Sequence, residues 1–331
     1  VGPAPPAVVI GRGARVPAFG RHPVLDGRRG NAAGRRGGDT TPAANTPAAT
    51  AGASTPISQA ATYPMTLTDM LGREVAIDAE PAKVAALSPT TVEYVYTAGG
   101  TSVTRSSSVR YPAEAAGATD IGLSYQPNFE IIAAQAPDLI IADSILQAQL
   151  EDQLEALNVP VLYAGAESFD DAPAGLRLVG MAIGNEEAGE TAAKALEDKK
   201  AEVIAKLPAD KPSVLVLNGT PDDFYVAKPE SYVGDLLAIL GVSNVAAGQP
   251  DSGRFPGYTK LSLETILADG PEVILGITAG PPGGAKITDA LSANPAWQDT
   301  PAVQQKRVSE IDAVVFLQAP GPRAGEGLET L

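Results

Sequence analysis

Two similar stretches, NFEIIAAQAPDLIIA at residues 128–142 and SLETILADGPEVILG at residues 262–276, determine the expected architecture. The second begins 134 residues after the first, and five of the 15 aligned positions are identical. Each has an N-capping residue, a Glu in the first helical turn, a short helix, a Pro and an apolar strand. A repeat this long favours two similar α/β lobes with a ligand cleft between them.

The flanking sequence supports this duplication. Residues 83–87 and 213–217 are short apolar runs typical of buried strands, and a predicted helix follows each of them, at residues 231–240 in the second half. Thr90 and Glu93 fit a capping box at the start of the first of these helices. Strands that alternate with helices at short intervals predict parallel sheets, so we expect an α/β fold with two Rossmann-like lobes.

The longest predicted helix lies between the two halves. Nothing from Glu186 to Leu207 breaks a helix, and the segment would extend roughly 33 Å. We therefore expect an N-terminal α/β lobe at residues 65–169, a helical linker at 170–207 and a C-terminal α/β lobe at 208–331. A single long helix that braces both lobes would limit their hinge motion.

Residues 1–64 differ in composition from the rest of the chain. They are rich in Gly, Pro, Ala and Thr, and they hold seven Arg against two Asp, a net charge of +5. With few bulky apolar residues they cannot offset the entropy of ordering, so we expect a disordered tether. A flexible basic leader is favoured over a segment that binds an anionic surface. No apolar core of a signal peptide is visible in this segment.

Composition excludes several classes of function. The whole chain carries −15, so the residues after the tether carry −20, which argues against nucleic-acid binding. The absence of cysteine excludes disulfides and thiolate sites, and no apolar run approaches the ~18 residues that would cross a bilayer. The single histidine, His22, lies in the tether, and P-loop and Gly-x-Ser-x-Gly motifs are absent. These absences argue against an enzyme. If the protein is an enzyme, the alternative that we consider is a two-lobed sugar-nucleotide transferase.

A series of short motifs then occurs in order along residues 65–331. They are DMLGREV at 69–75, KVAALSPTTVE at 83–93, YPAE at 111–114, NFE at 128–130, APDLIIA at 136–142, LSLE at 261–264, PEVIL at 271–275 and GPR at 321–323. In combination they resemble the substrate-binding proteins of ABC importers for iron siderophores, haem and cobalamin. The resemblance implies two lobes joined by one long helix, an extracytoplasmic monomer without an intrinsic cofactor, and a membrane permease dimer as partner.

Two glutamates occupy matching places in the repeat. The resemblance implies that Glu130 and Glu264 project from the two lobes and dock onto arginines of the permease. The alternative is that each carboxylate only complements the dipole at the N-terminus of its helix.

Candidate ligand-binding residues follow the carboxyl ends of the predicted strands, where loops line the cleft of a two-lobed α/β protein. They are Ser88, Thr90, Ser107, Arg110 and Tyr125 in the first lobe and Phe224, Tyr225, Arg254, Tyr258 and Arg323 in the second. Aromatic rings offer stacking area and arginines pair with anions, although packing or surface positions remain the alternative for each. Arg323 could also brace the structure, because its Gly and Pro neighbours set a rigid turn.

The expected ligand is haem, a ferric siderophore or a corrinoid. Residues 104–112 and 122–126 resemble the haem-binding branch most. Haem iron takes an axial His, Tyr, Cys or Met, so with His22 in the tether the ligand would be Tyr125 or Tyr258. A siderophore that saturates its iron needs no protein ligand. The lack of histidine argues against binding of bare zinc or manganese.

Overall fold

The structure is a computed structural model that describes residues 62–253, 255–280 and 283–331. These residues belong to one compact unit of the chain. We call residues 65–169 the N-terminal lobe and residues 208–331 the C-terminal lobe. The predicted tether lies outside the described residues, except for residues 62–64.

The N-terminal lobe is built on a five-stranded parallel sheet with the strand order β5-β4-β3-β8-β9. These strands are β3 (Val84–Ala86), β4 (Ser102–Arg105), β5 (Thr119–Asp120), β8 (Leu139–Asp143) and β9 (Val161–Ala164). Two antiparallel hairpins lie outside this sheet, β1 (Met65–Thr68) with β2 (Glu74–Ile77) and β6 (Gly122–Leu123) with β7 (Gln126–Pro127). The helical segments are α1 (Pro89–Thr97), η1 (Ala113–Gly117), α2 (Phe129–Ala134), η2 (Ala148–Leu150) and α3 (Glu151–Glu155).

The C-terminal lobe has a mixed six-stranded sheet. Its strands are β10 (Ser213–Gly219), β11 (Phe224–Ala227), β12 (Ser243–Asn244), β13 (Tyr258–Thr259), β14 (Val273–Thr278) and β15 (Val308–Glu310). The helical segments are α6 (Tyr232–Leu240), α7 (Leu263–Asp269), α8 (Ile287–Ala293), η3 (Pro295–Trp297), α9 (Pro301–Gln304), the π turn η4 (Val314–Gln318) and α10 (Ala324–Thr330). The predicted parallel pairing holds for β10, β12, β14 and β15, whereas β11 and β13 run antiparallel to their neighbours. A tight turn after β10 folds β11 back directly, so this edge needs no crossover helix.

The duplication seen in the sequence is repeated in the strand register. Val84 of β3 lies opposite Leu139 of β8, and Val214 of β10 lies opposite Val273 of β14. Leu139 and Val273 are equivalent positions of the repeat, 134 residues apart. The central strand pair is therefore built in the same way in both lobes.

An acidic residue anchors this strand pair in each lobe. The Asp138 carboxylate accepts hydrogen bonds from the backbone N–H groups of Ala82 and Lys83, at 2.9 Å each. The equivalent Glu272 accepts one from the N–H of Ser213, also at 2.9 Å. Both acids directly follow the Pro that ends the preceding helical segment, so the repeat preserves the anchor together with the register.

The predicted caps of the repeated helices are present. The Asn128 side-chain oxygen accepts the N–H of Ile131 at 3.0 Å at the start of α2. The Ser262 hydroxyl accepts the N–H of Thr265 at 3.2 Å at the start of α7. Each bond satisfies a backbone donor that a helix N-terminus leaves unpaired.

The predicted capping box of α1 is wrong by two residues. Ser88 is the cap: its hydroxyl accepts the N–H of Thr91 at 3.1 Å, and the Thr91 hydroxyl accepts the N–H of Ser88 at 3.0 Å. Pro89 favours this earlier start, because proline is suited to the first helical position. Thr90 and Glu93 are therefore not paired with each other, and Glu93 is buried inside the protein.

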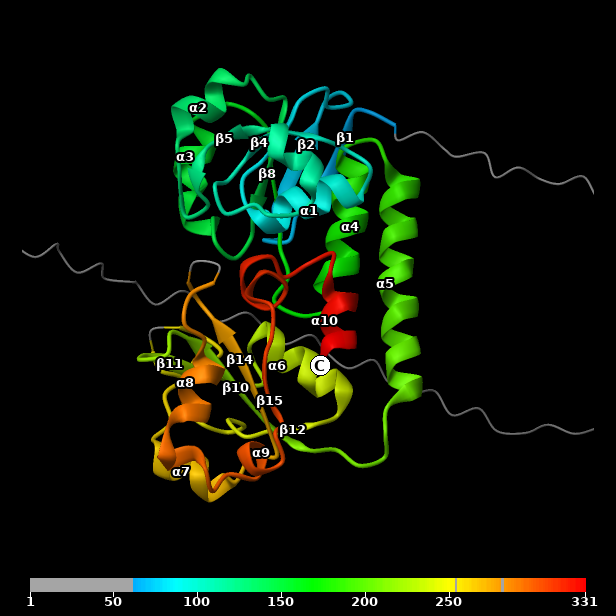
Figure 1. The fold of residues 1–331 in the computed structure, drawn as a ribbon. Helices are drawn as coiled ribbons and strands as arrows, with labels where there is room; N and C mark the ends of the chain where they lie inside the picture. Colours follow the sequence, from blue (N-terminus) through cyan, green and yellow to red (C-terminus); the bar gives the residue numbers. More distant parts are fainter. Residues whose placement is uncertain (1–61, 254, 281–282) are drawn as a thin grey trace, which may run out of the picture. The chain divides into compact units, whose positions relative to one another are not determined.

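Two long helices follow the N-terminal lobe. α4 (Asp171–Ala182) and α5 (Glu186–Lys206) form an antiparallel pair, and Figure 1 shows α5 running beside both lobes. The pair packs closely because a Cβ on Gly180 would lie 2.9 Å from the Cα of Gly189. The 21 residues of α5 extend about 32 Å, close to the length expected from the sequence. Within the described residues, no helix is both long and apolar enough to span a membrane.

The buried side chains show how the lobes are held. One hydrophobic cluster is shared, and it includes Val84 of β3, Val216 of β10, Leu176 of α4, Leu196 of α5 and Leu328 of α10. Two smaller clusters belong to one lobe each, on the opposite faces of the two sheets. The lobes thus have a common core through α4, α5 and α10 in addition to their own.

Candidate functional site

Loops at the carboxyl ends of the parallel strands form a cavity between the lobes. β3 and β8 end at Ala86 and Asp143, and β10 and β14 end at Gly219 and Thr278. A cavity of about 360 Å³ is lined by Arg110 from the N-terminal lobe and otherwise by the ends of β14 and β15, η4 and the adjoining loops of the C-terminal lobe. This is the position at which ligands bind in open α/β folds.

A second cavity, of about 390 Å³, lies in the C-terminal lobe and has an aromatic wall. Tyr225 of β11 meets Phe255 edge-on with ring centroids 5.0 Å apart, and Tyr258 of β13 lines the same space. Leu317 of η4 completes this wall. The antiparallel β11–β13 insertion therefore supplies the aromatic surface. Burial raises the pKa of the Tyr258 phenol, so this group stays protonated at neutral pH.

The inter-lobe cavity carries two cations, Arg110 and Lys286. Neither has a carboxylate partner among the described residues; Arg110 donates instead to the backbone carbonyls of Ser107 at 2.8 Å and Val109 at 3.0 Å. The Ser107 hydroxyl donates to a carbonyl of the β6–β7 hairpin at 3.1 Å. Glu310 in the same cavity already accepts a threonine hydroxyl and a backbone N–H, both at 2.8 Å. Asp312, the other carboxylate of this cavity, accepts the backbone N–H of Val314 at 2.8 Å, so neither carboxylate is paired with the two cations.

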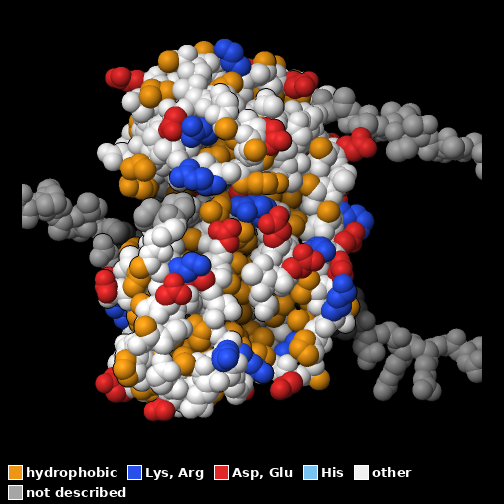
Figure 2. Space-filling model, viewed as in Figure 1, with side chains coloured by type: hydrophobic (Ala, Val, Ile, Leu, Met, Phe, Trp, Pro, Cys, Tyr) orange, Lys and Arg blue, Asp and Glu red, His pale blue; other side chains and the backbone are white. Residues whose placement is uncertain are grey.

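Exposed hydrophobic side chains gather on the cleft loops. Among the described residues nine large hydrophobic side chains are exposed. Five of them, Tyr111, Leu123, Tyr125, Ile145 and Leu146, lie on segments that follow the carboxyl ends of β4, β5 and β8, and Phe255 lines the aromatic cavity. Figure 2 shows hydrophobic and charged side chains together where the two lobes meet. Tyr125, at the turn of the β6–β7 hairpin, is 61% exposed. A concentration of this kind is typical of a surface that binds an apolar ligand.

Asp143 holds the loop that presents Ile145 and Leu146. Its buried carboxylate accepts the backbone N–H groups of these two residues at 2.9 and 3.0 Å and the Ser88 hydroxyl at 2.9 Å. Burial raises the pKa of Asp143, and these hydrogen bonds oppose the rise. Ser88, a predicted ligand residue, is fully buried and serves this loop and the cap of α1. No motif marks Asp143, Ile145 or Leu146, because they simply continue an apolar strand.

The structure brings part of the predicted ligand set to the cleft. Arg110, Tyr225 and Tyr258 line the two cavities, and Tyr125 is exposed on a cleft loop. Arg254 lies outside the described residues. Phe255 and Lys286 also line these cavities, and no pattern in the sequence marks them, because an isolated Phe or Lys carries no signal without its neighbours in space.

Other predicted ligand residues are used inside the protein. Phe224 packs edge-on against Trp297, with ring centroids 6.5 Å apart. Thr90 is buried near the start of α1. Arg323 forms a two-pronged ion pair with Glu93, which matches the bracing alternative for this arginine.

Glu130 and Glu264 are both exposed, in the first turns of α2 and α7. Figure 1 shows these two helices at the ends of the lobes that lie farthest from the junction. Hydrogen bonds from its own backbone and from Ser262 lower the pKa of Glu264, so it is ionised at neutral pH. Neither residue lines a cavity described above.

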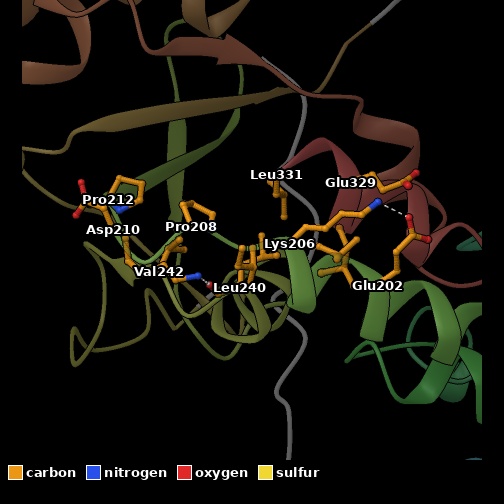
Figure 3. Close-up of a pocket in the computed structure, with 13 residues that line it drawn as sticks. Glu202, Lys206, Pro208, Asp210, Pro212, Leu240, Val242, Glu329 and Leu331 are labelled. Atoms are coloured by element: carbon orange, nitrogen blue, oxygen red, sulfur yellow. Dashed lines mark hydrogen bonds and ion pairs between the residues drawn. The ribbon is translucent and has the colours of Figure 1, made fainter.

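A further cavity, of about 400 Å³, lies at the C-terminal end of α5 (Figure 3). Its walls come from α5, the loop after it, the end of α6 and α10, and they are largely apolar, with Leu207, Leu240 and Leu328 among them. Lys206 pairs with Glu202 at its rim. It contains none of the predicted ligand residues and is separate from the cleft.

Comparison with known sequences and structures decides the family. The sequence pattern of the periplasmic binding proteins matches residues 84–315. The chain belongs to this family. Among periplasmic binding proteins with related sequences, the ABC transporter substrate-binding lipoprotein YvrC of Bacillus subtilis is 27% identical over 282 residues, which cover 81% of this chain and 84% of that protein.

Solved periplasmic binding proteins have the same fold. The haem-binding protein RhuT of Roseiflexus sp. RS-1 is 28% identical, with a TM-score of 0.64 over 75% of this chain and 95% of that one. SirA of Staphylococcus aureus, solved with staphyloferrin B, gives a TM-score of 0.65 over 81% and 97% of the two chains. At 20% identity SirA supports the two-lobed fold alone. The family comprises transport proteins rather than sugar-nucleotide transferases.

Proposed function

We propose that this periplasmic binding protein captures an iron or cobalt tetrapyrrole, haem first among them, in the cleft between its lobes. It would then deliver this ligand to an ABC permease on the outer side of the cytoplasmic membrane. The apolar character of the cleft loops is the observation that carries the proposal. Related proteins of the family are described as haem-binding, as is RhuT, or as part of a haem uptake system, as is IsdE of Staphylococcus aureus.

The apolar wall favours a tetrapyrrole over a small, highly charged chelate. A citrate-type chelate exposes carboxylates on most of its surface and needs several cations. The described cleft offers Arg110 and Lys286 without carboxylate partners, whereas Arg323 is held by Glu93. Two cations beside an aromatic and aliphatic surface suit a flat apolar ligand that carries two carboxylates at one edge.

Tyr125 is the proposed ligand to haem iron. Its side chain projects from a hairpin turn at the cleft and is more exposed than any other large hydrophobic side chain among the described residues. Tyr258, the second candidate, sits where burial raises the pKa of its phenol, which disfavours the phenolate that binds iron. The remaining aromatic residues, Tyr225 and Phe255, would stack on the macrocycle.

Glu130 and Glu264 are proposed to dock the protein onto the permease. They stand at equivalent positions of the two lobes, so a dimeric permease can receive both with equivalent basic sites. Their distance from the cleft separates docking from ligand capture.

Titration of the purified chain with haemin, monitored by absorption spectroscopy, tests the ligand. We expect saturable binding with a shifted Soret band and the charge-transfer bands of phenolate-bound ferric haem. Tyr125→Phe should remove the phenolate bands, and truncation to Tyr125→Ala should weaken binding about thirtyfold or more, as is common for a central aromatic contact. Tyr258→Phe is the matched control and should keep the bands.

Titrations of the same protein with other ligands show which results would contradict the proposal. Binding of ferric citrate or a ferric siderophore without binding of haemin or cyanocobalamin would contradict the tetrapyrrole assignment. Loss of the phenolate bands in Tyr258→Phe instead of Tyr125→Phe would contradict the assignment of the iron ligand. The dimethyl ester of haemin should bind more weakly than haemin itself if Arg110 and Lys286 receive the carboxylates.

A further inference from the structure

An ion pair joins the two lobes. Arg323 precedes α10 in the C-terminal lobe, and Glu93 lies on α1 of the N-terminal lobe. The Arg323 Nε and Nη2 atoms donate to the two Glu93 carboxylate oxygens at 2.9 and 2.7 Å. The side chains are 12% and 1% exposed, so both charges are largely removed from water. A buried pair of this geometry depends on both partners, because either charge left alone would be poorly solvated.

The pair is connected to both walls of the inter-lobe cavity. The Arg323 guanidinium lies 4.8 Å from the ring centroid of Tyr111, which follows Arg110 in sequence. Arg110 lines the cavity from the N-terminal lobe. On the other side, η4 carries Gln318 into the same cavity before the chain reaches Arg323. A displacement of Arg323 would therefore shift the segments that carry Arg110 and Gln318, two residues that line the cleft.

The segment with Arg323 lies against α1 at Gly321. A Cβ at this position would be 3.4 Å from the Thr90 methyl group and 3.5 Å from the Tyr94 ring. The backbone of the C-terminal lobe thus lies directly against α1, and Thr90 forms part of this contact surface rather than of an open cavity.

Acidic groups surround the pair on more than one side. The Glu326 carboxylate of α10 lies 4.0 Å from Arg323, and Asp312 also acts on the pair from the segment before η4. Burial raises the pKa of Glu93 to about 7, and the hydrogen bonds from Arg323 oppose this rise. A pH above this value, such as pH 8, favours the ionised form of Glu93 and is suitable for testing the charged pair.

We propose that Glu93, Arg323 and Tyr111 form a latch that sets the separation of the two lobes and thereby positions the two walls of the cleft. The role in ligand capture rests on the proposed function, whereas the role in lobe separation does not. These residues are positioning residues: Arg110 and the cavity walls contact the ligand, and the latch fixes where those walls stand.

Arg73 provides a matched control within one lobe. Its guanidinium donates to Asp69 at 3.0 Å and to Glu151 at 2.6 Å, and it lies 4.4 Å from the ring centroid of Tyr163. The chemistry is the same as at Arg323, an arginine that combines carboxylates with an aromatic ring. All of these partners belong to the N-terminal lobe, so loss of Arg73 removes similar interactions without acting between lobes.

The test measures the distance between the lobes. Because the chain lacks cysteine, Ala134→Cys on α2 and Ala268→Cys on α7 can carry two spin labels at exposed, equivalent positions of the repeat. Pulsed electron paramagnetic resonance at pH 8 should give one narrow distance distribution for this labelled parent. Arg323→Leu should broaden the distribution and shift it to longer distances, whereas Arg73→Leu should lower the melting temperature and leave the distribution narrow.

Graded variants cover the case in which Arg323→Leu does not fold. Arg323→Lys keeps the charge but loses the two-pronged geometry and the stacking, and Tyr111→Ala removes the ring alone. Both should give distributions between those of the parent and of an unlatched protein, with weaker haemin binding in the same order. Distributions identical to the parent in every Arg323 and Tyr111 variant, or equal broadening in Arg73→Leu, would overturn the latch. Since no ligand enters the distance measurement, a failure of haemin to bind would leave its result intact.

Discussion

The two lobes share the pairing of their central strands and differ in the surfaces that they present to the cleft. In both lobes the central strands pair in the same register, and an acid after the repeated Pro anchors them. The surfaces toward the cleft have diverged: the N-terminal lobe presents a tyrosine hairpin and an Ile–Leu loop, and the C-terminal lobe presents aromatic residues on an antiparallel insertion. The difference indicates that the duplicated strand pairing determines the fold, while the segments that face the cleft are not constrained by it.

The largest expected effect, on the free energy of unfolding, tests whether the central strands contribute equally to stability in the two lobes. Ile140 and Ile274 are matching positions of the repeat, and both are fully buried in the separate core of their own lobe. Ile140→Ala and Ile274→Ala should each lower the free energy of unfolding by about 2–5 kcal/mol, because each leaves a cavity. Urea unfolding measures the effect. Two equal losses in a single transition are expected since the lobes share a core; a separate early transition for only one variant would break the equivalence.

A smaller effect distinguishes the two anchoring acids. Asp138 accepts two backbone N–H groups and Glu272 accepts one, and each such bond contributes about 0.5–1.5 kcal/mol. Asp138→Ala should therefore lower the free energy of unfolding about twice as much as Glu272→Ala. Asp138→Asn and Glu272→Gln keep an acceptor oxygen and serve as controls. Equal losses for the two alanine variants would show that the duplicated acids contribute through charge rather than through the number of bonds.

The smallest effect on stability is expected for Glu130 and Glu264. Here the two lobes are compared by their contribution to uptake. The double change Glu130→Ala and Glu264→Ala should leave the melting temperature and haemin affinity nearly unchanged, because both side chains are exposed and neither lines one of the cavities. Uptake into cells of the native host should be lost. Each single variant should retain part of the uptake, since one docking site remains. Full uptake by the double variant, or a parallel loss of haemin affinity, would remove the docking role.

Local sequence patterns predicted the helices, the central strands and the duplication well. The repeat, the two helix caps and the helix that became α5 all depend on residues close together in sequence, namely a capping side chain, an apolar period or the absence of a breaker. The antiparallel course of β11 was missed because a short strand contains no information about its partner. The four residues 220–223 were enough to reverse it.

The cleft was predicted less completely, for a related reason. Tyr225 and Tyr258 could be selected because aromatic residues near strand ends favour binding. Phe224 has the same local appearance as Tyr225, but strand alternation directs it against Trp297 in the core. The role of Glu93 could not be predicted from its neighbours, because its partner lies 230 residues away and the local sequence offered Thr90 as a more obvious one.

That separation also bears on how the protein comes to be folded. Glu93 is synthesised long before Arg323, and α10, which packs against α5, follows Arg323 in the chain. A nascent chain that has completed only the N-terminal lobe still lacks the segment that covers α1, so that surface stays open until synthesis has passed residue 323. Contacts between such distant residues form slowly, because the closure of a long loop comes first. The Glu93–Arg323 pair is thus a late contact in the assembly of this fold.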